Sequence, residues 1–214
     1  MQFLLLLLLF VANLSFSYEI SDYPHQSRYD EKLKYITDER YLSEALDDSD
    51  LDLVFSALKR VGELRLTNLK PKVIGLISLA NPQANQDKPK LLANYRNIFY
   101  LGILVIGKIG NGDDDASFIT SFLRDTKKDP LATSYILMAL GEFKGNKKAL
   151  DFLQEYSLLI NPRTDSRVVR SLVDAIVSHG NKKSNVYLIK LKKNTNKEDQ
   201  PYIDAAIDKL RRLK

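Results

Sequence analysis

Three short stretches of the sequence end alike and recur at a fixed interval. They are VIGKIGN, ALGEFKGN and AIVSHGN, and their closing Gly-Asn pairs begin at residues 110, 145 and 180, which are 35 residues apart each time. Self-similarity at a period of about 20–50 residues is typical of repeat proteins, in which each repeat is one supersecondary unit stacked on the next. This interval constrains the fold more than any other feature of the chain.

A small apolar dipeptide marks the same place in each repeat. It occurs five times, at spacings of 48, 34, 36 and 31 residues: Ala57-Leu58, Val105-Ile106, Ala139-Leu140, Ala175-Ile176 and Ala206-Ile207. The polar segment 81–90 (NPQANQDKPK) is expected to be a surface loop, which accounts for the long first interval. After four of the dipeptides comes a glycine that we expect to end a helix in the left-handed conformation: Gly62, Gly110, Gly145 and Gly180.

Helical periodicity lies on both sides of these glycines. Upstream, residues 165–179 place apolar side chains at i, i+4 and i+8, which gives a wide apolar stripe. Downstream, shorter and more polar helices are expected over 116–123, 147–156 and 183–191. A helix, a tight turn and a second helix form an αα-hairpin, and hairpins must stack because one alone cannot bury both faces. We therefore predict an all-α fold, a right-handed α-solenoid of about five hairpins over residues 47–214.

Two of the repeats carry the motif of a known family. Residues 129–143 (DPLATSYILMALGEF) and 165–181 (DSRVVRSLVDAIVSHGN) resemble the bacterial HEAT-like repeats of the type found in phycobilin lyases. Asp129-Pro130 matches the opening of that consensus and Val169-Arg170 matches its Val-Arg pair, which the other repeats lack. The resemblance covers roughly residues 47–214 and implies a solenoid scaffold. It leaves the function open, because such scaffolds bind many things.

The chain begins with a segment that is typical of a secretory signal peptide. Residues 1–17 (MQFLLLLLLFVANLSFS) combine an apolar run with small residues near a cleavage site after Ser17. The run is too short to span a bilayer, so we expect a periplasmic or secreted protein that is not transmembrane. The alternative is that the segment is kept as an anchor. The absence of cysteine excludes disulfides and thiolate metal sites.

Residues 18–46 form a tyrosine-rich leader. They contain five of the eleven tyrosines: Tyr18, Tyr23, Tyr29, Tyr35 and Tyr41. The last four are six residues apart, which rotates a helix by about 240°, so they cannot share one helical face. We expect a helical cap that covers the first repeat, as solenoids require. The alternative is an aromatic contact surface for a sugar or a peptide.

Motifs for catalysis are missing from the sequence. It has no Gly-rich phosphate loop, His-Glu-x-x-His or Gly-x-Ser-x-Gly pattern. His25 and His179 are the two histidines, and His179 stands where Ile109 and Phe143 stand in neighbouring repeats, which indicates a packed helix end. Residues 113–115 (DDD) lack the ligand spacing of a calcium loop and are expected to cap a helix. We therefore predict no enzymatic activity, no metal and no cofactor.

One charge pattern follows the repeat. Just beyond the glycines come the aspartates 113–115, then lysine pairs, and after the last dipeptide an arginine pair; the predicted partner-binding residues are Lys147, Lys148, Lys182, Lys183, Arg211 and Arg212. Equivalent positions of stacked repeats line up, so this edge should run from acidic to basic toward the C-terminus. Lysines at a helix start oppose the helix dipole, which favours a binding role. A second basic set, Lys127-Lys128 and Lys192-Lys193, is expected on the opposite edge.

These features together predict a non-enzymatic protein-binding or scaffold module of the cell envelope. It would use the concave face of the second helices and the basic edge to hold an acidic protein or an anionic envelope polymer. A ligand-handling or lyase-like HEAT-repeat enzyme is one alternative, and it needs a cluster of acid and base groups that the sequence does not supply. A nucleic-acid-binding HEAT-like solenoid is the other alternative. The net charge of +5 is modest for that class, and the alternative applies only if the chain is not exported.

Overall fold

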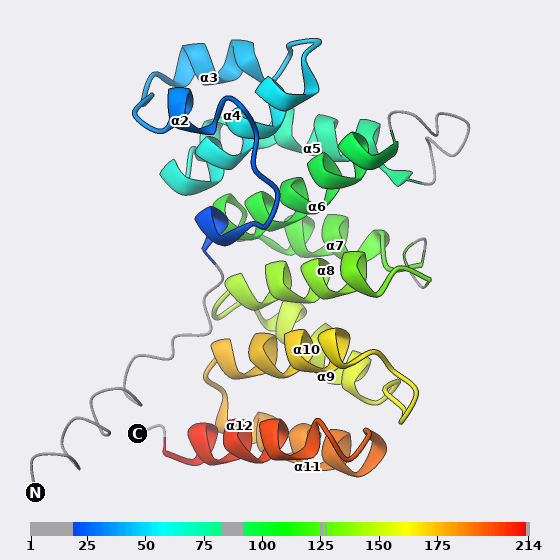
Figure 1. Cartoon of the computed structure of the whole chain (residues 1–214). Helices are drawn as coiled ribbons and strands as arrows, with labels where there is room; N and C mark the ends of the chain where they lie inside the picture. Colours follow the sequence, from blue (N-terminus) through cyan, green and yellow to red (C-terminus); the bar gives the residue numbers. More distant parts are fainter. Residues whose placement is uncertain (1–18, 83–91, 125, 127, 213–214) are drawn as a thin grey trace, which may run out of the picture.

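The computed structural model describes residues 19–82, 92–124, 126 and 128–212. Over these residues the protein is all-helical, with about ten helices packed in pairs and no strand (Figure 1). The predicted signal peptide, Tyr18, Lys127 and most of the predicted loop at 81–90 lie outside the described residues. The all-α class is therefore confirmed for the described part of the chain.

The helices form two layers. The first layer contains α4 (Leu51–Leu64), α6 (Leu92–Ile109), α8 (Pro130–Glu142), α10 (Ser166–Ser178) and α12 (Gln200–Arg212), each packed on the next. The second layer contains α5 (Lys70–Ala80), α7 (Asp113–Ser121), α9 (Lys147–Ser157) and α11 (Asn185–Asn194). In this layer α9 contacts both α7 and α11. Helices thus pack in the order of the sequence, as the stack in Figure 1 shows.

The five small apolar dipeptides form the middle of the hydrophobic core. Each of their ten side chains is at most 5% exposed. The apolar stripe predicted over 165–179 is confirmed as α10, whose buried residues include Val169, Leu172 and Ile176. Asp165 caps this helix by accepting the backbone N–H of Arg167 at 2.9 Å. The apolar stretch 98–107 is buried in α6, and no helix among the described residues is long and apolar enough to cross a membrane.

The predicted left-handed glycine stops are confirmed in two of the four repeats. Gly145 and Gly180 have φ values of +82° and +63°, and each follows a first-layer helix, α8 and α10. Gly110 follows the end of α6 at Ile109 but does not take a positive φ. Gly62 instead lies inside α4, which ends at the left-handed residue Arg65 (φ 54°). A Cβ on Gly62 would lie 2.8 Å from Val105 Cγ2, so this glycine serves close packing between helices.

The helix pairing also differs from the predicted hairpins. The prediction pairs each first helix with the second helix that follows it, yet α5 packs on α6 and α11 packs on α12. The helix α9 contacts α8 and α10 alike. The helix α9 therefore sits over the groove between two first-layer helices, whereas α5 and α11 pack mainly against the first-layer helix that follows them.

The leader packs against the start of the stack. Its helical segments are η1 (Ile20–Asp22), α2 (Asp30–Leu33) and α3 (Glu39–Ala45); η1 contacts α4 and α6, whereas α2 and α3 contact α4. Ile20, Tyr23, Leu33 and Leu42 are the buried anchors, and the Tyr23 ring lies 5.6 Å from that of Phe55. By contrast, Tyr35 and Tyr41 are 78% and 44% exposed. The leader therefore covers α4 while it leaves two aromatic rings in solvent.

Candidate functional site

The Gly-Asn phrases build the turns at one edge of the stack. After Gly145, the side-chain oxygen of Asn146 accepts the backbone N–H of Ala149 at 2.9 Å and so caps α9. Asn181 similarly accepts the N–H of Lys183 at 2.9 Å, at the start of η4 (Lys182–Ser184), which leads into α11. A left-handed glycine followed by a capping asparagine ends one helix and begins the next. The Gly145-Asn146 and Gly180-Asn181 pairs therefore form turns between helices.

An aspartate does the capping in the turn between α6 and α7. Asp115 Oδ2 accepts the backbone N–H groups of Asn111 and Gly112 at 3.0 and 3.2 Å, and the ammonium of Lys70 at 3.1 Å. Burial alone would raise the pKa of Asp115, but these hydrogen bonds and the Lys70 charge outweigh burial and lower it. The capping role predicted for the aspartates 113–115 is confirmed for Asp115.

The predicted basic residues begin successive second-layer elements. Lys147 and Lys148 open α9, and Lys182 and Lys183 form most of η4 before α11. The Gln154 side chain donates to Ser184 Oγ at 3.0 Å, which ties α9 to the start of α11. All four lysines are exposed, as are Arg211 and Arg212 at the end of α12. In Figure 1 the end of α12 lies on the same side as the turn from α10 to η4.

The α9 part of this edge is less basic than the sequence suggested. Lys147 and Lys148 line a groove of about 520 Å³ between α7 and α9, together with the carboxylates of Asp113, Asp151 and Glu155 and the ring of Phe152. The Lys147 ammonium donates to Asp151 at 2.7 Å, and this bond holds the pKa of Lys147 above its ordinary value. The i, i+4 spacing of Lys147 and Asp151 was the signal for this pair. The more strongly cationic part of the edge is therefore Lys182 and Lys183.

The opposite edge is built mainly from structural carboxylates. Asp199, whose side chain is fully buried, accepts Ser166 Oγ at 2.7 Å and Arg170 Nε at 3.1 Å. Of the second basic set, Lys192 pairs with Asp204 at 2.6 Å, whereas Lys128 and Lys193 are exposed. Sequence reasoning missed Asp199, because its partners lie about 30 residues away and no local pattern marks them.

Both histidines have packing roles. His179 Nε2 lies 3.1 Å from the carbonyl oxygen of Leu140, and burial lowers the pKa of its ring. The prediction of a packed helix end is confirmed. The His25 ring packs edge-on against Phe55, with ring centroids 4.7 Å apart. In the part of the chain that the structure describes, no group of three or more potential ligand side chains could hold a metal ion.

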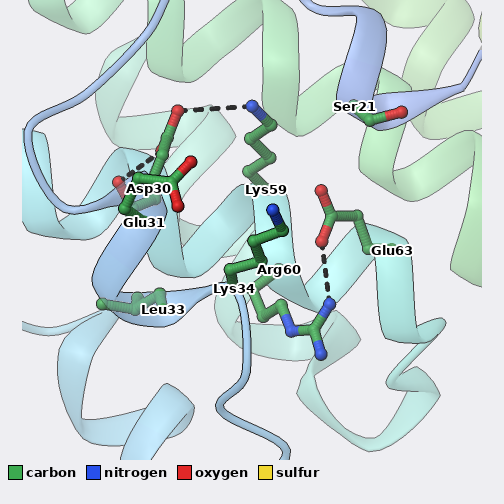
Figure 2. A pocket seen from close by; sticks show the side chains of 9 residues that line it. Ser21, Asp30, Glu31, Leu33, Lys34, Lys59, Arg60 and Glu63 are labelled. Carbon is green, nitrogen blue, oxygen red and sulfur yellow. Dashed lines mark hydrogen bonds and ion pairs between the residues drawn. The ribbon is translucent and has the colours of Figure 1, made fainter.

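A second hollow lies between the leader and α4 (Figure 2). It measures about 180 Å³, and its charged lining residues are Asp30, Glu31, Lys34, Lys59, Arg60 and Glu63. Asp30 accepts Ser56 Oγ at 2.7 Å and the Lys59 ammonium at 3.3 Å, and Arg60 donates to Glu63 at 3.0 Å. Figure 2 shows the Asp30–Lys59 and Arg60–Glu63 pairs as two separate contacts in the lining. The bonds of Asp30 to Ser56 and Lys59 fasten the leader to α4. The bond from Arg60 Nε to the Ile36 carbonyl oxygen at 2.9 Å does the same, whereas the Arg60–Glu63 pair lies within α4.

A carboxylate with a raised pKa lies between α10 and α12. Burial raises the pKa of Asp174 to about 6, although the Tyr202 hydroxyl donates to it and Lys209 and Arg170 lie near. An acid with a raised pKa in the folded state holds its proton more tightly when folded. Its contribution to stability is present below about pH 4 and is lost as the pH rises through about 6.

Asp174→Asn should therefore change the pH dependence of folding. At about pH 7.5 the variant is expected to be about 2 kcal/mol more stable than the wild type, because an amide avoids the buried charge. At about pH 4 the two should be nearly equal. Urea unfolding at both pH values measures this, with Asp208→Asn on the exposed side of α12 as the control. An equal difference at both pH values would show that Asp174 does not titrate in this way.

Comparison with protein-family models finds no match, and comparisons with curated proteins and with solved structures find none either. The two helical layers and their sequential packing therefore define the class: an all-helical protein of paired helices.

Proposed function

We propose that the protein is an α-solenoid of about five HEAT-like helical pairs that acts as a non-enzymatic binding module of the cell envelope. Its partner is an acidic protein, held by the second-layer face and the edge where the second-layer helices begin. Export depends on residues 1–17. The sequential packing of first-layer helices and the HEAT-like motifs at 129–143 and 165–181 support the solenoid.

The observation that carries this proposal is the alignment of exposed lysines across repeats. Lys147, Lys148, Lys182 and Lys183 begin adjacent second-layer elements, and α9 contacts α11 directly. None of them is buried, so a partner can reach their side chains, although Lys147 is already paired with Asp151. In the groove beside Lys147, the Phe152 ring offers an apolar contact to a bound segment. The three carboxylates of the groove select the register of that segment. Lysines act as point charges, so binding should weaken with salt.

The test is a charge reversal of the edge. A tagged wild-type protein, a variant with Lys147, Lys148, Lys182 and Lys183 changed to Glu, and a control with Lys32, Arg96, Lys128 and Lys197 changed to Glu are used to capture proteins from the envelope fraction. All the control positions are exposed and lie away from the edge. We expect acidic partners to be depleted by about tenfold or more with the edge variant and kept by the control.

The same partners at equal yield in all three samples would refute the edge as the binding site. The mass of the purified chain provides a separate check on export, since removal of residues 1–17 leaves Tyr18 as the first residue. An intact N-terminus on a cytoplasmic protein would contradict the envelope location but would not affect the charge-reversal result.

A further inference from the structure

The two ends of the stack carry opposite charge. Residues 19–52 contain eleven carboxylates and four cationic side chains, whereas residues 175–197 contain six lysines and no carboxylate. The leader helix α3 and the helix α11 lie at opposite ends of the stack in Figure 1. The acidic and basic ends of one molecule therefore cannot neutralise each other directly.

The outer side of α11 combines lysines with exposed apolar residues. Val186, Ile189, Lys190 and Lys193 stand at i, i+3, i+4 and i+7, so they share one helical face, which we call the α11 stripe. Val186 and Ile189 are 50% and 39% exposed, and both lysines are exposed. The opposite side of the helix is anchored in the core by Leu188 and Leu191, which are fully buried. The helix is thus held in place while its stripe faces solvent.

The leader presents a surface of matching chemistry. Tyr41 and Glu44 lie on α3 at i and i+3, and Asp48 lies in the segment just after the helix; all three are exposed, and we call them the α3 stripe. The ring of Tyr35, 78% exposed, belongs to the turn just before α3. Glu44 pairs with Arg40, but these side chains are 67% and 89% exposed, and such a surface pair contributes little. This end therefore offers carboxylates and aromatic rings, which complement the lysines and the apolar side chains of the α11 stripe.

We propose that the α11 stripe of one molecule docks on the α3 stripe of a second copy of this chain, head to tail. Lys190 and Lys193 meet Glu44 and Asp48, and the apolar pair Val186 and Ile189 covers exposed tyrosine. Because two different surfaces meet, the contact is heterologous and can add further copies in the same direction. It leaves the turns at Lys147 and Lys182 free but uses the α11 part of the second-layer face, and its test variants leave Lys147, Lys148, Lys182 and Lys183 unchanged.

Charge on the neighbouring helices argues against a membrane as the occupant. In the same layer as α11, α7 and α9 carry Asp113, Asp114 and Glu155, all exposed. An anionic bilayer lying along the layer would meet these carboxylates as well as the lysines. A short leader segment contacts α11 alone, and it brings the opposite charge.

Sedimentation of the full chain, with any natural processing of its N-terminus, tests the contact. The wild type is run over a concentration series at about 0.02 M and about 1 M salt, which changes the Debye length from roughly 20 Å to about 3 Å. We expect mass above the monomer at low salt, and an association constant at least about tenfold lower at high salt. Lys190→Glu with Lys193→Glu should abolish association, as should Glu44→Lys with Asp48→Lys. A mixture of these two variants should associate again.

The matched control changes Lys128 and Lys144 to Glu, which alters the net charge equally at exposed positions outside both stripes and should associate like the wild type. Circular dichroism shows whether each variant keeps its helices. A wild type that stays monomeric at low salt overturns the proposal, and so does undiminished association of the Lys190→Glu, Lys193→Glu variant. Binding of a poly-glutamate peptide or of phosphatidylglycerol vesicles by a monomeric wild type would reassign the α11 stripe to a foreign acidic segment or to a membrane.

Discussion

Replacing Glu142 by alanine is expected to lower the free energy of unfolding by about 3–5 kcal/mol. The Lys108 ammonium in α6 lies 3.2 Å from Glu142 Oε1 in α8, and the two side chains are only 3% and 14% exposed. Pairing offsets the cost of burying these two charges. Glu142→Ala takes the Glu142 carboxylate away from the Lys108 ammonium, which stays buried. The pair also joins successive first-layer helices, and its loss should weaken their contact.

Two comparisons separate this effect from a general loss of charge. Glu44→Ala breaks the exposed pair with Arg40 and should change stability by less than about 0.5 kcal/mol. The double variant Lys108→Met, Glu142→Met removes both buried charges and should recover most of the loss, because apolar side chains of similar size can replace a buried pair. Urea unfolding of the four proteins gives the values. If Glu142→Ala is as mild as Glu44→Ala, the buried pair does not hold α6 to α8.

Polar bridges of this kind recur along the stack. The Tyr100 hydroxyl in α6 donates to Asp129, the N-cap of α8, and Ser166 and Arg170 in α10 donate to Asp199, which precedes α12. In each case a side chain of one repeat satisfies a group of the next. Stacked repeats contact only their neighbours, so such links couple each unit to the following one in addition to apolar burial.

Much of the fold could be predicted because each repeat is marked by residues that are close together in the sequence. The five small apolar dipeptides are buried as expected, since each lies on the apolar side of a helix whose period is visible in its own segment. Gly145 and Gly180 likewise take the turn conformation that their local sequence indicates. Repetition of one local pattern then implies that equivalent positions stack, which places the lysines of the predicted edge side by side.

The remaining features depend on residues that are distant in sequence. Gly62 resembles a helix stop, but its surroundings are set by Val105 and Ile20, about 40 residues away on either side. A sequence window around Gly62 contains neither contact. At the predicted site, the lysine positions follow from the repeat, whereas the closeness of Lys147 to Asp113 depends on α7 and α9 sharing a groove. Repeat spacing predicts which positions line up; it does not predict which charges are already matched.

The last prediction concerns two glycines inside first-layer helices. A Cβ on Gly107 would lie 2.9 Å from the Cα of Ala139, and one on Gly141 would lie 2.8 Å from the Cα of Ala175. The glycine of each Ala-Leu-Gly or Val-Ile-Gly phrase thus faces the alanine of the next phrase. Backbone atoms cannot rotate away, so Gly141→Ala must push α8 and α10 apart. We expect a loss of about 2 kcal/mol, after allowing for a gain in helix propensity of about 1 kcal/mol.

Gly75→Ala in α5 is the matched control, because nothing lies within 4 Å of the added Cβ. There only the propensity gain applies, and stability should rise by about 0.5–1 kcal/mol. The same substitution therefore has opposite signs at two helical glycines. A gain at Gly141 equal to that at Gly75 would mean that the first-layer helices have room to spare, and the repeated small residues would then need another explanation.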